Sequence, residues 1–259
     1  MLDQLIHQHH LQKSHCVNIL SHEFYQLTQV DMSELSADER RDAARWQIRE
    51  RIDYPPEEAV VDLFEVAPFS SEKKPLTYVV SAQEKILRDR VELFNNCDLK
   101  LVAIDIPEFA LRNICDLFTE DSRGVAILLL LEESGMLVIA RDGTLYLTRL
   151  FSTGMNDLIP YANGEFEALT DRLDAIVLEI QRSFDFCEST FHLPMVSRLL
   201  VAQTGLEIPA VISYLNEYLS TQVETFSFSG VLTVSEDVDP LQLNRNLLAI
   251  GGALRQESN

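Results

Sequence analysis

The amino-acid sequence predicts an α/β protein. Between Tyr78 and Leu111 a short apolar strand is followed by a helix, a second strand and another helix. The apolar residues of the first helix are Ile86, Leu87, Val91 and Phe94. Their spacing of three and four residues is typical of a helix that packs on a sheet. The second strand, residues 99–106, is a nearly continuous apolar run, which is typical of a strand covered on both faces. We therefore interpret the stretch as a βαβ-type crossover.

Before this stretch, the sequence predicts a short helix, a strand, an extended segment and a further strand, at residues 2–12, 16–20, 24–30 and 60–66. Ser36 and Glu39 have the spacing of a capping box, which predicts the start of another helix. That helix should continue through Ile52 and end before Tyr54-Pro55-Pro56, because a residue that precedes proline is pushed out of the helical region. A polar loop is expected at residues 69–75.

The second half begins with three short β-rich runs, at residues 125–131, 136–141 and 145–151. Asp142-Gly143 separates the last two, and an Asp-Gly pair between such runs is a strong hairpin signal, so we expect an antiparallel meander. A long amphipathic helix, a strand, a helix, a strand and a closing helix are predicted next, at residues 165–187, 197–202, 208–219, 223–226 and 239–255. We therefore divide the chain into two α/β halves, residues 1–120 and 121–259.

The composition excludes several classes of function. The 259 residues include 21 basic and 41 acidic side chains, a net charge of −20, and such a balance disfavours nucleic acid because phosphates need clustered Lys and Arg. No run approaches the ~20 apolar residues of a spanning helix, and no signal peptide is evident. The four cysteines are Cys16, Cys97, Cys115 and Cys187. They are scattered and form no CxxC pair, which favours reduced thiols over disulfides or a zinc site. We expect a soluble cytoplasmic protein.

Few residues have the spacing of a metal or catalytic site. Four histidines lie near the start of the chain, at His7, His9, His10 and His15. They would surround the first helix instead of sharing one face, so we predict no metal site. Asp62 and Asp105 could be interpreted as an acid pair, but Asp105 ends a strand where a carboxylate can cap the next helix. A hydrolase site would need a nucleophile elbow around its serine. The candidate residues Ser183, Ser189 and His192 have no such motif around them. The sequence therefore predicts no catalytic residue.

The predicted helix at residues 38–53 combines five arginines with Trp46, the only tryptophan. Arg41, Arg45 and Arg49 recur four residues apart and would form one stripe along the helix. One interpretation is a solvated face whose charges pair with acids in the same segment, Asp38, Asp42 and Glu50. The other is a docking face for an acidic partner or for anionic lipid head groups, where each basic residue contributes ~1 kcal/mol.

Five segments in order resemble the type IV pilus assembly protein PilM family, and among its members those of the mannose-sensitive haemagglutinin (MSHA) pilus. They are WQIRERIDYPPEEAVVDLFEV, SAQEKILRDRVELFNNCDLKLVAIDIPEFAL, MLVIARDGTLYLTRLFSTG, IQRSFDFCES and DPLQLNRNLLAIGGALR, which begin at residues 46, 81, 136, 180 and 239. The resemblance implies an actin-like fold (ASKHA, or ribonuclease H-like) with two lobes. Its N-terminal lobe would cover residues 1–120 with an inserted subdomain, and its C-terminal lobe residues 121–259.

The sequence departs from the family's nucleotide motifs. The N-terminal strand pair with its "GIDIG"-like phosphate loop has no counterpart, because Met1 already lies in the helix expected after it. The second phosphate loop aligns with Leu130-Leu131-Glu132, where a carboxylate would repel a triphosphate. The adenosine-side "GGGA" aligns with Ala202-Gln203-Thr204-Gly205, which removes close backbone approach. We therefore expect no enzymatic activity and no cofactor; the alternative is an ATP-binding, magnesium-dependent actin-like ATPase.

The resemblance implies a scaffold peripheral to the bacterial inner membrane, within a type IV (MSHA-type) pilus platform. Its partners would be other platform proteins and the cytoplasmic tail of a PilN-like single-span protein, MshJ-type in the MSHA system. An extended tail would use an apolar groove and backbone hydrogen bonds. The candidate partner-binding residues are Phe24, Tyr25, Leu27, Arg41, Arg45, Trp46, Arg49, Ile52 and Tyr54. A further alternative is the cytoplasmic domain of a type II secretion platform protein.

Overall fold

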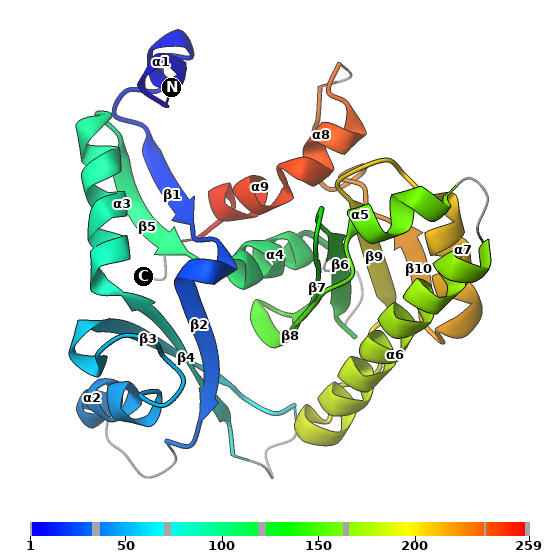
Figure 1. Ribbon diagram of the computed structural model, residues 1–259, viewed down its shortest axis with the longest axis horizontal. Helices are drawn as coiled ribbons and strands as arrows, with labels where there is room; N and C mark the ends of the chain where they lie inside the picture. The colour runs from blue at the N-terminus through cyan, green and yellow to red at the C-terminus, as the bar shows by residue number, and fades with distance from the viewer. Residues whose placement is uncertain are drawn as a thin grey trace. The chain divides into compact units, whose positions relative to one another are not determined.

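The computed structural model describes residues 2–32, 37–69, 74–118, 123–162, 166–235 and 237–256. The chain forms two compact units, which Figure 1 shows in ribbon form. Unit 1 comprises Met1–Ala67 and Ser71–Pro107, and unit 2 comprises Pro68–Ser70 and Glu108–Asn259. The predicted cap at Ser36 and part of the predicted loop, residues 70–73, lie outside the described residues.

Unit 1 contains a two-stranded parallel sheet, formed by β1 (His15–Ile19) and β5 (Lys100–Asp105). Helix α1 (Leu2–Gln8) precedes β1, and α3 (Glu84–Asn96) packs on β5. The prediction that this second strand is covered on both faces was wrong, because β5 alternates between exposed and covered residues and Val102 is 45% exposed. An apolar run of six residues thus does not by itself distinguish a central strand from a half-covered one.

A second sheet of unit 1 has three antiparallel strands in the order β2-β4-β3. Their bounds are Tyr25–Val30 for β2, Leu76–Gln83 for β4 and Ala59–Val66 for β3; the short 3₁₀ helices η1 (His22–Phe24) and η2 (Pro56–Glu58) precede β2 and β3. The predicted crossover from the strand at Tyr78 to the strand at residue 99 was wrong, since β4 and β5 belong to different sheets. The parallel neighbour of β5 is β1, and the whole three-stranded sheet is inserted between them.

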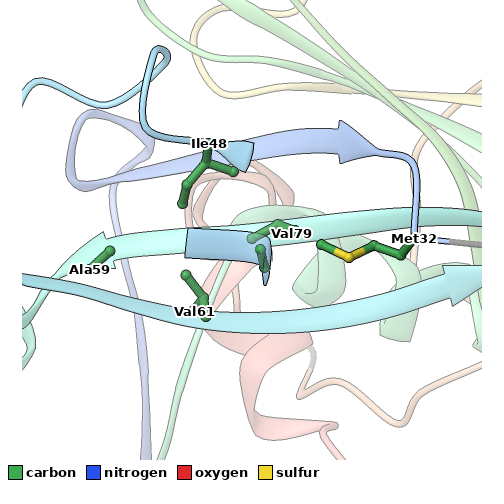
Figure 2. Packing of buried hydrophobic residues seen from close by; sticks show 6 residues of the cluster. Met32, Ile48, Ala59, Val61 and Val79 are labelled. Carbon is green, nitrogen blue, oxygen red and sulfur yellow. The ribbon is translucent and has the colours of Figure 1, made fainter. Parts of the chain in front are cut away.

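Helix α2 (Ala37–Gln47) covers one face of the three-stranded sheet. Ala44 of α2 and Ile48 just after it are fully buried and pack against Val61 and Val79, as Figure 2 shows for Ile48 and the two valines. The predicted helix end at Ile52 was wrong: the α-helix ends at Gln47 and a turn follows, closed by the bond from Arg51 N–H to Ile48 O. Burial of Ile48 directs the chain into the core at this point.

Unit 2 is built on a five-stranded sheet in the order β10-β9-β6-β7-β8. The strands are β6 (Val125–Leu130), β7 (Gly135–Arg141), β8 (Thr144–Phe151), β9 (Arg198–Gln203) and β10 (Gln222–Thr225). The predicted meander is confirmed, because β6, β7 and β8 pair antiparallel in sequence order. Strands β9 and β10 extend the sheet in parallel on the other side of β6, and every residue of β6 is buried.

The helices of unit 2 are α4 (Pro107–Cys115, which begins at the unit boundary), α5 (Met155–Leu158), α6 (Phe166–Phe191), α7 (Pro209–Tyr218), α8 (Pro240–Arg245) and α9 (Leu247–Ala253), with 3₁₀ helices η3 (Asp116–Phe118) and η4 (Ile159–Tyr161). The single closing helix predicted over residues 239–255 is two helices, because Asn246 leaves the helical region at φ −101° and ψ 11°. Along the described ranges, none of the helices is both long and apolar enough to cross a membrane.

Candidate functional site

The face of the three-stranded sheet opposite α2 is mostly apolar and only partly covered, and its polar residues include Asp62, opposite Val80, and Gln29, opposite Tyr78. Residues directly opposite each other in an antiparallel pair share a face, so the register places Tyr25 beside Ala82 and Leu27 beside Val80. On the same face the rings of Phe64 and Tyr78 stack, with centroids 5.3 Å apart. Val60, also on this face, is 41% exposed. This surface, the β2–β4–β3 face, contains two of the predicted partner-binding residues.

Strand β2 lies at the edge of this sheet, since β4 is its one strand neighbour within the described ranges. An edge strand offers backbone N–H and C=O groups to an added strand. Phe24, immediately before β2, lies under the guanidinium of Arg90 from α3, 5.4 Å from the ring centroid. A predicted aromatic residue thus lies at one end of an open edge and adjoins the apolar face.

The predicted arginine residues connect α2 to strand β3. Arg41 pairs with Asp62 at 3.7 Å, and Arg40 with Glu65. Arg45 pairs with Asp42 at 2.9 Å and also donates to the carbonyl of Ala59 at 3.1 Å. Because Arg49 follows the helix end, the predicted stripe of three does not form along one helix; Arg49 pairs with Glu50.

The local pairs with Asp42 and Glu50 agree with the interpretation of a solvated, paired face, whereas the pairs with Asp62 and Glu65 have no signal in the sequence. Trp46 differs from its arginine neighbours, because 56% of it is exposed on α2.

Two predicted binding residues belong to the core side of the sheet. Ile52 and Tyr54 pack against the cluster around Ile48 and Val61. Burial raises the pKa of the Tyr54 hydroxyl above its usual value, an effect that the neighbouring Ser81 hydroxyl partly offsets. The nine candidates therefore divide between the β2–β4–β3 face, the outer side of α2 and the core between the two.

In unit 2 the residues aligned with the phosphate loop form a turn whose backbone is already hydrogen-bonded. The N–H of Leu131 donates to Ser134 O at 2.9 Å. The carbonyls of Leu131 and Glu132 accept from the N–H groups of Met155 and Asn156, at 2.7 and 2.9 Å. A Cβ at Gly154 would lie 2.4 Å from Ser134 N, so the chain can pass this close to the turn because residue 154 is glycine. The Glu132 side chain remains exposed.

The residues aligned with the adenosine-side motif adjoin this turn. Thr204 donates to Leu130 O through both its N–H, at 3.1 Å, and its hydroxyl, at 2.8 Å. The side chain of Gln203 accepts from Ile208 N–H at 2.9 Å, and Ala202 is fully buried. The structure thus brings the two predicted segments together at the ends of β6 and β9.

Two residues without a signal in the sequence complete this arrangement. Asn244 donates through Nδ2 to Gln203 O at 3.1 Å, and Arg245 donates through Nε to Thr204 O at 2.8 Å. Both lie in α8, about 40 residues beyond the strand they contact, and sequence periodicity does not report such long-range contacts. The carbonyls that a nucleotide would approach are therefore hydrogen-bonded within unit 2.

The other residues weighed from the sequence have structural partners. Asp105 accepts from Ile106 N–H at 2.9 Å directly before α4, whereas Asp62 is exposed and pairs with Arg41. Ser183 donates to Glu179 O at 2.6 Å within α6. His7 lies 3.6 Å from Asp3 on the exposed helix α1. In the residues that the structure describes, His, Cys, Asp and Glu do not gather in threes as a metal site requires.

Comparison with known proteins identifies the fold. No family model matches the sequence, and no curated protein matches it either. Among solved structures, the chain is similar to a PilM-PilN type IV pilus biogenesis complex, with a TM-score of 0.74 and 19% identity over 98% of this chain and 84% of that one. It is also similar to the cytoplasmic domain of EpsL, an inner membrane component of the type II secretion system of Vibrio cholerae, with a TM-score of 0.52 and 11% identity over 99% of this chain and 80% of that one. The chain therefore has the actin-like fold that the sequence predicted.

Proposed function

We propose that this protein is a non-catalytic cytoplasmic scaffold of a type IV pilus platform at the bacterial inner membrane, of the MSHA (MshI) type. Its partner would be the cytoplasmic tail of a PilN-like, MshJ-type single-span protein, together with other platform proteins. The observation that carries the proposal is the likeness to the PilM-PilN complex, which extends over 98% of the chain. The order of the five resembling segments supports the same assignment.

The tail would bind to unit 1 along the edge of β2. Backbone groups of an extended tail can complete the open edge, and its alternate apolar side chains can pack on the β2–β4–β3 face. Leu27 and Val80 occupy the centre of that face, and Phe24 lies at its end. Basic residues in the tail would be attracted by the net charge of −20, which mainly raises the association rate.

The arrangement in unit 2 supports a scaffold that does not hydrolyse ATP. Glu132 would place a carboxylate beside the phosphates of a nucleotide, where its negative charge would repel them. The bonds from Asn244 and Arg245 to the loop carbonyls would also have to break before a base could approach. Each such bond left unmade in a buried site costs ~1–3 kcal/mol.

Calorimetry with a synthetic tail tests the proposal directly. We expect a peptide that carries the first cytoplasmic residues of the PilN-like single-span protein to bind with a Kd of ~1 μM, which is a binding free energy of about −8 kcal/mol. Leu27→Asp should weaken binding at least about tenfold, because it places a charge against the apolar face. Leu206→Asp, at a residue 56% exposed in unit 2, is the matched control and should bind as the unmodified protein does. Absence of binding to tails of the whole platform would overturn the proposal.

The likeness to EpsL favours a second candidate, the cytoplasmic part of a type II secretion platform. Tails from pilus and secretion platforms, compared on the same protein, separate the two. The enzymatic alternative is tested by melting the protein with magnesium and ATP. A nucleotide at 100 times its Kd would add ~2.7 kcal/mol of stability, and a shift of that size would establish a nucleotide-binding protein.

A further inference from the structure

A cavity of about 410 Å³ lies in unit 2. Its lining includes Asn244, which also contacts the Gln203 carbonyl in the arrangement described above. Its described lining residues belong to the chain between β10 and α8 and to α8 itself, and the cavity is partly open to solvent. The volume falls within the range of sites that take small molecules, ~300–1,000 Å³, and exceeds what a single inserted side chain fills. Long irregular segments are uncommon in compact domains, and binding loops are one of their usual roles.

The floor of the cavity is aromatic. Phe226 and Phe228 are 4% and 2% exposed, and their rings meet edge to face with centroids 4.9 Å apart. The walls are partly buried aliphatic side chains, Leu232, Val234 and Leu243. Ring edges and faces at such an angle offer a further ring the offset or perpendicular contacts that aromatic groups prefer. The shape and lining thus suit a planar aromatic group.

None of the lining residues that the structure describes carries a charged side chain. Asp237 lies beside it, bonded to the hydroxyl of the lining residue Ser235, and that bond holds the pKa of the Asp237 carboxyl below its usual range. Asp239 follows and caps α8 through a bond from Leu241 N–H. The nearest arginine in sequence, Arg245, donates to Thr204 O. An anionic ligand would therefore lose its hydration beside the carboxylates of Asp237 and Asp239, and no described lining residue would supply a cation.

Asn244 supplies one oriented polar group. It is 4% exposed, and its Nδ2 donates to Gln203 O, which fixes the amide. Its Oδ1 is an amide oxygen, which can accept up to two hydrogen bonds. A ligand that donates to Oδ1 would contribute the net worth of one hydrogen bond, ~0.5–1.5 kcal/mol.

We propose that this cavity binds an uncharged, planar aromatic small molecule that donates a hydrogen bond to Asn244 Oδ1. The ring occupies the aromatic floor, and polar edges of the ligand reach the serine and threonine hydroxyls around the opening. The inference does not depend on tail binding to unit 1, because the cavity lies entirely within unit 2.

The test uses two probes of one shape, 2-naphthamide and 2-naphthoate, titrated into ¹⁵N-labelled full-length protein. We expect saturable shifts for the amides of Phe228, Leu232 and Asn244 with 2-naphthamide. The anionic 2-naphthoate should bind at least about tenfold more weakly, because its charge is buried without a partner. Equal affinity for the two probes, or shifts located elsewhere in the protein, would overturn the proposal.

Filling the cavity provides the second arm of the experiment. Val234→Trp should abolish the 2-naphthamide shifts while the rest of the spectrum remains unchanged. If this variant does not fold, Ser229→Trp, at an exposed lining residue, replaces it. Ser213→Trp on the exposed side of α7 is the matched control and should retain full binding. Binding that survives in a folded cavity-filled variant would also overturn the assignment.

Discussion

Two parallel strand pairs, one in each unit, differ mainly in what lies beside them. The pair β9–β10 and the pair β1–β5 are both parallel, and a helix precedes the second strand of each. Strand β9 has β6 as its other neighbour, with β7 and β8 beyond it, and five of its six residues are buried. Strand β1 has β5 as its strand neighbour within the described ranges, and none of its five residues is fully buried. A parallel strand pair is thus part of a buried core in one unit and of a half-covered layer in the other.

The difference shows that the strands next to a pair, more than the pair itself, decide how much apolar area it buries. A parallel pair needs cover on both faces to be stable, and each buried side chain contributes in proportion to the area removed from water.

The largest expected contrast is between truncations in the two equivalent strands. Leu200→Ala in β9 removes a side chain that is 2% exposed and should cost ~3–5 kcal/mol. Ile19→Ala in β1, at a partly exposed residue, should cost ~1–2 kcal/mol, because part of its area already meets water. Equilibrium unfolding in urea, followed by circular dichroism, measures both. Equal losses would contradict the contrast.

A second prediction concerns close helix packing in unit 2. A Cβ at Gly251 in α9 would lie 2.2 Å from the carbonyl oxygen of Ala110 in α4, and Asn113 donates to Gly251 O at 2.9 Å. Gly→Ala inside a helix normally gains ~1 kcal/mol, but here backbone must move, so we expect a loss of ~2 kcal/mol. Ala249→Gly, on the exposed side of α9, reports propensity alone and should cost ~1 kcal/mol. A stabilising Gly251→Ala would show that the helices can separate freely.

The cysteines extend the contrast to chemistry. Cys115 and Cys187 in unit 2 are buried, while Cys16 and Cys97 in unit 1 are half-buried. Burial raises the pKa of the Cys187 thiol to about 12 and that of Cys115 also well above its usual value. Ellman's reagent at pH 8 should therefore label the two thiols of unit 1 first, since the thiolate is the reacting form. Faster labelling of Cys187 than of Cys97 would contradict the burial difference.

The same shifts predict how stability depends on pH. The folded state keeps these protons to a higher pH than the unfolded state, so stability is intact below pH 9 and falls as the pH rises from 9 toward 12. At pH 10 the loss should be ~1 kcal/mol for Cys187. Cys187→Ala should flatten this slope relative to its own stability at pH 7, and an unchanged slope would assign it to other groups.

The smallest expected effect is at the surface of unit 1. Arg41→Ala breaks a 3.7 Å pair whose partners are 69% and 81% exposed, and we expect a loss below ~0.5 kcal/mol. Ile48→Ala, in the fully buried position next to α2, should cost ~2–4 kcal/mol in the same unit. Together they ask whether apolar packing or ion pairs hold α2 to the sheet. A larger loss of stability for Arg41→Ala than for Ile48→Ala would show that ion pairs, and not apolar packing, hold α2 on the sheet.

The elements with strong local signals were predictable from the sequence. The Asp-Gly turn and its flanking β-rich runs gave the meander with boundaries within one residue, and the amphipathic stripe gave α6, although the helix extends to Phe191 instead of ending at Cys187. What failed depended on distant contacts. The strand beside β5 could not be identified from residues 78–111, because β1 lies about 80 residues earlier. The helix end at Gln47 follows from burial of Ile48 against β3 and β4, which no local pattern encodes.

The candidate sites show the same limit. The meeting of Leu130 with Thr204 follows from the pairing of β6 with β9, and the resemblance anticipated it. Asn244 and Arg245 did not stand out, because their role comes from two bonds to carbonyls 41 residues away. Ile52 and Tyr54 were proposed as groove residues on the family resemblance, yet both side chains pack against the core cluster beneath α2.

The single neighbour of β1 within the described ranges has a practical consequence for handling the protein. The free backbone groups of an edge strand can pair with the same strand of a second copy of the chain, and natural proteins often prevent this with lysine or proline in the edge strand. Strand β1, His-Cys-Val-Asn-Ile, has neither. Concentrated samples should therefore oligomerise through this strand, and a lysine placed at Val17 should keep them monodisperse.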